Sequence, residues 1–291
     1  MQAVDYVSAS SVKEVVSLLT SHNGRARVLC GGTDLLVQLR EKRRKAELLI
    51  DIKNIPELTA IQYDAGAELW LGAAASCYAI CRDRVVREGY PGLVDAIQLI
   101  GGMQIQYRAS VGGNLCNASP AADSIPALIV HEGMCVISNQ NGSRHVAAEK
   151  FCLAPGKNIL QEGEVLVAVS IPPPKENFGA HYLRFIPRNE MDIAVVGAGA
   201  AVTFDSAKRK ILSARIALGA VAPTPLFVEE AGAFLAGREI TQETIHKAAE
   251  IAQAAARPIS DLRGTADHRK QLCAVLTRRA LEKAIERAKG S

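Results

Sequence analysis

The stretch that decides the fold is VLCGGTDLL, residues 28–36, together with ASVGGNLCNASPAAD, residues 109–123. Each stretch runs from apolar residues into a pair of glycines and then into small polar residues. Glycine adopts positive φ angles without steric cost and lets another group approach the backbone closely. Successive backbone N–H groups in such a turn form a concave site for an anion. The two stretches therefore predict two loops that hold the two phosphates of a dinucleotide.

Neither glycine pair belongs to one of the common phosphate-binding patterns. A P-loop is excluded because no Gly-Lys-Ser or Gly-Lys-Thr follows, and the Rossmann spacing GxGxxG is absent. A single Gly-Gly-Thr-Asp is weak evidence, because ordinary turns use the same residues. The second stretch strengthens the prediction, since it adds donors and acceptors suited to ribityl or ribose hydroxyls, namely Asn114, Asn117, Ser119 and Asp123.

The composition indicates a globular chain with a sizeable core. The length of 291 residues suggests about two domains, and 48% of the residues are hydrophobic. The formal net charge of +4 comes from well-mixed acidic and basic residues, so nucleic acid is not indicated as a partner. No apolar run reaches the ~18 residues that a membrane span needs, and the first residues lack a signal-peptide pattern. We therefore expect a cytoplasmic protein without a membrane span.

Seven cysteines are spread along the chain without any CxxC pair. Cys77 and Cys81 would share one face of a helix, but a metal site needs more ligands than these two. No iron–sulfur spacing is present. We expect reduced, mostly buried thiols and no metal site in this chain.

Hydrophobic patterning and capping signals predict a mixture of helices and strands. The first expected helix opens with the capping residues 11–14 and ends at Asn23-Gly24; the others span 34–41, 76–87, 91–100, 121–130, 227–236, 242–256 and 266–288. The expected strands span 27–30, 48–52, 69–74, 134–138, 165–171, 180–186, 196–204 and 211–219. The run PPPK at 172–175 is the clearest interruption, so we place a domain boundary there.

Five motifs in the same order resemble the FAD-binding medium subunit of the molybdenum hydroxylases, a family that includes bacterial xanthine dehydrogenases and carbon monoxide dehydrogenase. The motifs are residues 28–36, residues 112–123, RFIPRNEMDIA at 184–194, LGAVAPTP at 218–225 and SDLRGTA at 260–266. The resemblance covers nearly the whole chain. One departure is Cys30, which stands where the family usually has alanine.

The resemblance implies an α+β fold with two domains. Residues 1–175 would form a two-lobed FAD-binding module of the vanillyl-alcohol oxidase (PCMH) type, with lobes at about 1–57 and 58–175. Residues 178–291 would form a C-terminal domain of the CO dehydrogenase flavoprotein type, with a small antiparallel sheet and helices. FAD would lie between the two lobes.

The resemblance also implies which residues bind FAD. From the first motif these are Val28, Leu29, Cys30, Gly31, Gly32, Thr33, Asp34 and Leu35. From the second they are Ala109, Val111, Gly112, Gly113, Asn114, Asn117, Ser119 and Asp123. Val165 and Leu166 align with apolar residues near the flavin or adenine, and Arg184 with a position whose charge would stabilise reduced, anionic flavin. No catalytic residue is expected, because the redox chemistry belongs to the cofactor.

By the same resemblance the chain is an electron-transfer subunit. A molybdopterin-binding large subunit would hydroxylate the substrate, and a [2Fe–2S] small subunit would pass the electrons to FAD and then to NAD or another acceptor. The assembly would be a dimer of heterotrimers. Its substrate, for which a purine is mildly favoured, would bind on another chain. Two other functions stay open, a free-standing flavin oxidoreductase of the same fold and a scaffold that has lost FAD.

Overall fold

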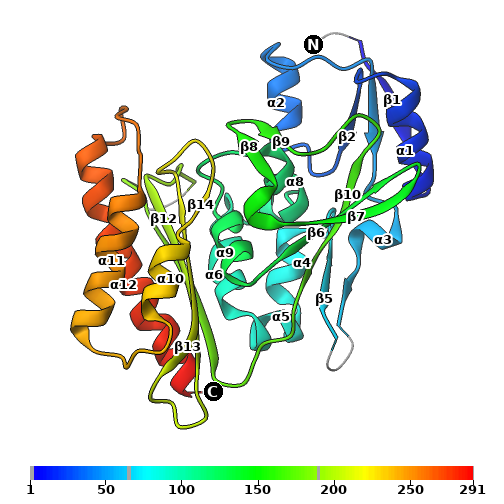
Figure 1. Ribbon diagram of the computed structural model, residues 1–291. Helices are drawn as coiled ribbons and strands as arrows, with labels where there is room; N and C mark the ends of the chain where they lie inside the picture. Colours follow the sequence, from blue (N-terminus) through cyan, green and yellow to red (C-terminus); the bar gives the residue numbers. More distant parts are fainter. Residues whose placement is uncertain (1–2, 64–66, 189–190, 291) are drawn as a thin grey trace.

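The computed structural model describes residues 3–63, 67–188 and 191–290 and shows a mixed helix-and-sheet fold, as expected. The chain opens with a small parallel sheet of three strands, in the order β1 (Asp5–Ser8), β3 (Leu48–Asp51) and β2 (Ala26–Leu29). Two helices connect these strands, α1 (Val12–Ser21) and α2 (Leu35–Arg40). This unit lies at the upper right of Figure 1.

Helix α1 begins where the capping signal predicts. The Ser11 side chain accepts a hydrogen bond from the Glu14 backbone N–H at 3.2 Å. The carboxylate of Glu14 turns back to Ser10 rather than to Ser11, so only half of the predicted capping box forms. Val15 and Val16 are buried, which packs the helix against the parallel sheet.

A five-stranded antiparallel sheet forms the second unit, with strand order β4-β5-β10-β6-β7. The strands span Ile61–Gln62 (β4), Leu69–Gly72 (β5), Met134–Asn139 (β6), Gly142–Ala147 (β7) and Val165–Ile171 (β10). The helices around it are α3 (Pro56–Thr59), α4 (Cys77–Arg82), α5 (Arg84–Gly89), α6 (Pro91–Ile97), α7 (Met103–Gln106), α8 (Val111–Asn117) and α9 (Ser124–Val130). A short 3₁₀ turn (Ala148–Lys150) leads into a small hairpin, β8 (Cys152–Ala154) and β9 (Lys157–Asn158).

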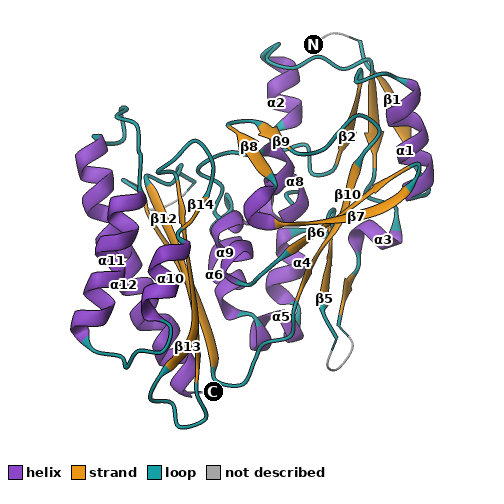
Figure 2. Cartoon of the chain, viewed as in Figure 1, coloured by secondary structure: helices purple, strands orange, loops and turns teal. Residues whose placement is uncertain are grey.

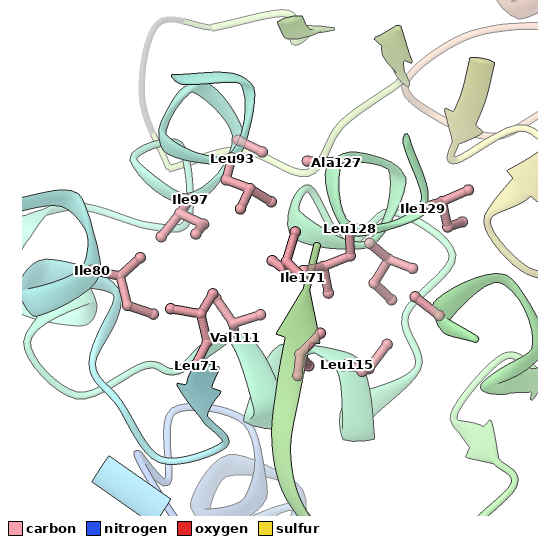
Figure 3. Packing of buried hydrophobic residues seen from close by; sticks show 14 of the residues in the cluster. Leu71, Ile80, Leu93, Ile97, Val111, Leu115, Ala127, Leu128, Ile129 and Ile171 are labelled. Atoms are coloured by element: carbon pink, nitrogen blue, oxygen red, sulfur yellow. The ribbon is translucent and has the colours of Figure 1, made fainter. Parts of the chain in front are cut away.

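The core of this unit lies between the sheet and its helices. All seven residues of β10 are buried, as expected for a central strand. Leu71 and Ile171 from the sheet meet Ile80, Leu93 and other helix residues in one apolar cluster (Figure 3). Burial of this apolar surface is the main force that holds the helices on the sheet.

The third unit is a four-stranded antiparallel sheet, β11-β12-β13-β14. Its strands span Phe178–Phe185, Val196–Phe204, Ile211–Gly219 and Leu226–Phe227. Helices α10 (Glu229–Leu235), α11 (Gln242–Ala255) and α12 (Ala266–Gly290) lie on one side of the sheet, and α6 and α9 of the second unit pack from the other (Figure 2). The small antiparallel sheet with helices that was expected after residue 178 is therefore confirmed.

Several local predictions were wrong. The expected helix over 76–87 is two helices, because the Asp83 backbone is extended and its carboxylate caps α5 by accepting from the Val86 N–H at 3.0 Å. The second glycine pair does not form a loop but lies inside α8. The strands β1, β4, β8, β9 and β14 and helices α3 and α7 were not predicted, because each has at most four residues and shows no clear period. Strand β7 has six residues and was also missed, because its sequence GSRHVA is mostly polar. Residues 189 and 190 of the third motif lie outside the described residues.

Candidate functional site

The two glycine pairs meet at one cleft, between the parallel unit and the second unit. Residues of β2 and α2 line it from the parallel unit, and residues of α8 and β10 line it from the second unit. Fourteen of the predicted residues line the cleft: Val28, Cys30, Gly31, Gly32, Thr33, Asp34, Leu35, Ala109, Gly112, Gly113, Asn114, Asn117, Val165 and Leu166. The structure thus brings together segments that lie about eighty residues apart in the sequence.

The first glycine pair forms the open turn that the sequence predicts. Gly32 has a φ of +74°, which favours glycine. The backbone N–H groups of Gly32, Thr33 and Asp34 donate no hydrogen bond to any of the described residues. The Asp34 side chain lines the cleft and makes no capping bond, and burial raises the pKa of its carboxyl. The turn therefore offers free donors and one carboxylate to a ligand.

Gly31 has a different role from Gly32. A Cβ atom on Gly31 would lie 2.1 Å from the backbone carbonyl oxygen of Arg108. No side chain fits there, so Gly31 lets the first loop touch the segment that precedes α8. A second contact ties the same two segments, since the Cys30 Sγ lies 3.1 Å from the Ser110 Oγ.

The prediction that the second glycine pair forms a phosphate-binding loop was wrong, because both glycines lie in helix α8. Ser110 is the N-cap of α8, and its Oγ accepts a hydrogen bond from the Gly113 N–H at 3.0 Å. That N–H is therefore not free for a phosphate. A Cβ on Gly112 would lie 2.4 Å from the Ala73 carbonyl oxygen, so Gly112 is required for packing. Gly113 is different, because a Cβ there would approach only the Ser110 Oγ, at 3.1 Å.

Two asparagine side chains of α8 are held in place by hydrogen bonds to neighbouring residues. The Asn114 Oδ1 accepts from the Ser124 Oγ at 2.6 Å, and the Asn117 Oδ1 accepts from the Gln38 Nε2 at 3.0 Å. Both asparagine Nδ2 groups donate to no other group in the part of the chain that the structure describes. Because the two oxygens are held, the two N–H₂ groups remain as donors for the oxygens of a ligand.

Five predicted residues do not line the cleft. Leu29 and Val111 are buried in the apolar clusters, and Figure 3 shows Val111 near Leu71 and Ile171. Ser119 accepts from the Ala121 N–H at 3.3 Å, in a local turn before α9. The remaining two are Asp123 and Arg184.

Asp123 and Arg184 bind each other at the junction with the third unit. The Arg184 Nη1 donates to the Asp123 Oδ2 at 2.5 Å, and the Tyr182 hydroxyl donates to the Oδ1 at 2.8 Å. Burial raises the pKa of Asp123 to about 6, although the Arg184 charge acts in the opposite direction. The Arg184 charge, which was expected to act on the flavin, is paired with Asp123 in this structure.

The structure adds cleft residues that sequence reasoning missed: Arg27, Gln38, Arg44, Ile52, Ala73, Ile100, Ser110, Cys116, Asn158, Leu160 and Glu164. Most of them come from segments without a motif, so only the folded chain identifies them. Ser110 and Cys116 are exceptions, because both lie in the second glycine stretch. For Ser110 there was a signal, since a serine just before an apolar residue and a glycine pair is typical of a helix N-cap.

The cleft has no obvious catalytic group. Burial raises the pKa of the Cys30 thiol, and it raises that of Cys116 to about 12, so both thiols are neutral and poor nucleophiles. Glu164 accepts from the Arg144 guanidinium at 2.6 Å, which lowers the pKa of this carboxyl to about 2. The arrangement can bind and orient an elongated anionic ligand, but it offers no activated nucleophile or base.

The described residues contain neither a group of metal ligands nor a membrane-spanning helix. No three of their His, Cys, Asp or Glu side chains are grouped as metal ligands would be. None of the helices in the described ranges is long and apolar enough to pass through a membrane.

Comparison with known proteins identifies the family. The family model described as the FAD binding domain in molybdopterin dehydrogenase matches residues 2–174, more than half of the chain. The chain belongs to the FAD-binding subunits of the molybdenum hydroxylases. A second model, the CO dehydrogenase flavoprotein C-terminal domain, matches residues 181–284. The protein is thus an oxidoreductase component, and its cofactor is FAD.

Individual relatives are similar over almost their full lengths. The xanthine dehydrogenase FAD-binding subunit of Escherichia coli O157:H7 is 30% identical, over 98% of this chain and 97% of the relative. The carbon monoxide dehydrogenase medium chain of Afipia carboxidovorans is 33% identical, over 98% of both chains. A solved carbon monoxide dehydrogenase from Hydrogenophaga pseudoflava, one that lacks the Mo-pyranopterin moiety, has a chain that matches with a TM-score of 0.94 and 32% identity over 98% of both chains.

Proposed function

We propose that this chain is the FAD-binding electron-transfer subunit of a heterotrimeric molybdenum hydroxylase of the xanthine dehydrogenase type. The observation that carries the proposal is the cleft between the two glycine pairs, with its free N–H groups and its oriented asparagines. When bound, the flavin supplies the electron-accepting and electron-donating chemistry. The chain itself binds the cofactor, orients it and keeps water from part of it.

Each group of cleft residues has a role in this proposal. The N–H groups of Gly32 and Thr33 would donate to the diphosphate, and the Asp34 carboxylate would accept from a ribose hydroxyl. Asn114 and Asn117 would donate to oxygens of the ribityl chain or ring. The apolar walls, which are Val165, Leu166, Ile100 and Leu160, would cover the flat rings. Asp123 and Arg184 do not line the cleft; in this proposal they would support the site indirectly, because their ion pair joins β11 to the start of α9.

The partners are inferred from the family. Electrons would arrive from the [2Fe–2S] clusters of a small subunit, after hydroxylation of the substrate on a molybdopterin-binding large subunit. They would leave to NAD or another acceptor. The name "medium chain", which two carbon monoxide dehydrogenase relatives carry, supports an assembly of three kinds of subunit, which we propose to be a dimer of heterotrimers.

We also propose the domain division and the compartment. Residues 1–175 would form the PCMH-type FAD domain, with lobes at about 1–57 and 58–175, and residues 178–291 the C-terminal domain. The ranges of the two family models support this division. All seven cysteines are free thiols, which supports a cytoplasmic location, because disulfides are rare there.

The test is a visible spectrum of the purified full chain, alone and together with the subunits that co-purify with it. A flavin band, with acid release of about one FAD per chain, is expected. Anaerobic addition of a purine substrate to the complex should bleach that band, whereas the same addition to the chain alone should not. Bleaching of the chain alone would favour a free-standing oxidoreductase. A colourless complex that cannot be reconstituted with FAD would refute the proposal.

A further inference from the structure

Two arginines share the cleft with the first glycine pair. Arg27 lies on β2, three residues before the loop that carries Gly31, and Arg44 lies in the connection from α2 to β3. Both residues line the cleft and are half-buried, and Arg27 also borders a neighbouring hollow beside Gly24 and Glu47. Neither residue belongs to any of the five motifs.

Arg27 is held in place without a counter-charge. Its Nη1 donates to the carbonyl oxygens of Gly24 and Ala26, at 2.5 and 2.8 Å. Its Nε is buried and has no acceptor among the described residues. Burial lowers the pKa of the Arg27 guanidinium, and the nearby charge of Arg44 lowers it further. A buried donor without an acceptor costs free energy, which a bound anion can relieve.

Arg44 also makes no ion pair within the part of the chain that the structure describes. Its Nη2 donates to the Gly156 carbonyl oxygen at 3.3 Å, across the cleft in the turn between β8 and β9. The cleft carboxylate Glu164 is already bound by Arg144 at 2.6 Å. Asp34, the other acidic side chain of the cleft, has no ion pair with either arginine within 4.0 Å.

The neighbouring arginines differ in this respect. Arg25 pairs with Glu47 at 3.2 Å, and Arg43 pairs with Glu41 at 2.6 Å. Neither lines this cleft. Two neighbouring arginines that do not line the cleft are thus paired with carboxylates, whereas the two that line it carry like charges that act on each other without an ion pair. Such an arrangement is unfavourable in the protein alone and becomes favourable when an anion lies between the charges.

We infer that Arg27 and Arg44 form a cationic clamp for the diphosphate of the ADP half of the cofactor, and that Arg44 leaves Gly156 to bind it. The inference rests on the proposed function, because it takes the cleft as the FAD site. It makes the pair a determinant of specificity, since riboflavin has no phosphate for the clamp to bind. Guanidinium groups suit this task because their paired N–H donors match phosphate oxygens.

The test is the affinity of the cofactor-free protein for FAD, measured by the quenching of flavin fluorescence. The full chain is used, with any subunits that co-purify with it. Arg27→Gln and Arg44→Gln should each weaken FAD binding by about tenfold or more, the range for loss of a charged hydrogen bond. They should change riboflavin binding by less than about twofold. ADP should compete with FAD for the wild type and compete more weakly for both variants.

Two controls match the charge change. Arg25→Gln and Arg84→Gln remove ion-paired arginines outside the cleft and should leave the FAD affinity within about twofold. Arg44→Lys keeps the charge and should retain most of the affinity. If Arg27→Gln does not fold, Arg44→Gln and the salt dependence of FAD binding decide the question, because a phosphate clamp weakens as salt rises.

The outcomes separate this inference from the proposed function. FAD binding by the wild type, with both cleft variants within twofold of it, would overturn the clamp and leave the FAD site standing. An equal loss in the control variants would also overturn it, since the effect would then be one of net charge. A wild type that binds no FAD in the presence of its partners would instead refute the proposed function.

Discussion

Replacement of the two adjacent glycines of α8 by alanine should have different effects on the stability of the chain. In Gly112→Ala the new Cβ would lie 2.4 Å from the Ala73 carbonyl oxygen, against a normal contact of about 3.5 Å. Helix α8 would have to move by about 1 Å from the segment that follows β5. Overpacking of this kind costs about 3 kcal/mol. For a chain of this size, such a cost corresponds to a fall in Tm of roughly 6–12 °C.

Gly113→Ala should leave stability nearly unchanged. Its Cβ would approach only the Ser110 Oγ, at 3.1 Å, and a helical alanine gains about 0.5–1 kcal/mol over glycine. The added group extends toward the cleft instead. We therefore expect Gly113→Val, with its larger side chain, to abolish FAD retention while the protein still folds.

The assay combines thermal unfolding of the cofactor-free chain with the ratio of FAD to protein after gel filtration. Gly112→Ala should lower the Tm, and Gly113→Val should lower the FAD content with a Tm near that of the wild type. Full FAD occupancy in Gly113→Val would refute the placement of Gly113 at the ligand. An unchanged Tm in Gly112→Ala would refute the close approach of α8 to Ala73.

Three further predictions follow from individual contacts. The pKa of Glu164 is lowered from 4.5 to about 2, so its pairing with Arg144 stabilises the fold above pH 4.5, and that contribution is lost as the pH falls toward 2. Glu164→Gln should therefore flatten the acid side of the Tm-against-pH curve, and an unchanged curve would contradict this sign. Arg287→Ala removes the bonds from Nη1 and Nη2 to the Asp95 carboxylate, at 2.5 and 3.0 Å, which join α12 to α6. Urea unfolding should show a loss of about 1.5–3 kcal/mol, with Arg287→Lys losing less; equal losses would show that the bidentate geometry is unimportant. Cys30→Ala introduces the usual residue of the family at a neutral thiol, so FAD titration should give an affinity within about twofold of the wild type, and a tenfold loss would assign the thiol a direct role.

The long, strongly periodic elements were predictable because their signals are local. A buried strand such as β10 appears in the sequence as the apolar run 165–171, and the break at Pro172 follows it directly. The helix over 121–130 was also found, with Pro126 in its first turn, where its missing N–H is tolerated. Its true start at Ser124 shows the usual uncertainty of element ends.

The site was predictable only where a motif marks it. The motif at residues 28–36 located the free N–H groups of the first loop, but it also included Leu29, which faces the apolar core. The pattern of the second glycine pair did not distinguish a loop from a helix, because Gly-Gly disfavours helix in isolation. The Ser110 cap and the packing on Ala73 override that propensity in the folded chain.

By itself, therefore, the sequence determined the class of fold, the family and the first glycine turn of the candidate site, because each depends on motifs of residues close together in the chain. The tertiary structure alone decided that Gly112 packs against Ala73, and that Arg27 and Arg44 line one cleft with no ion pair to a carboxylate of the described residues. These relations join segments from different units. They depend on how the packed sheets and helices come together, and that is a long-range property which no local pattern of residues encodes.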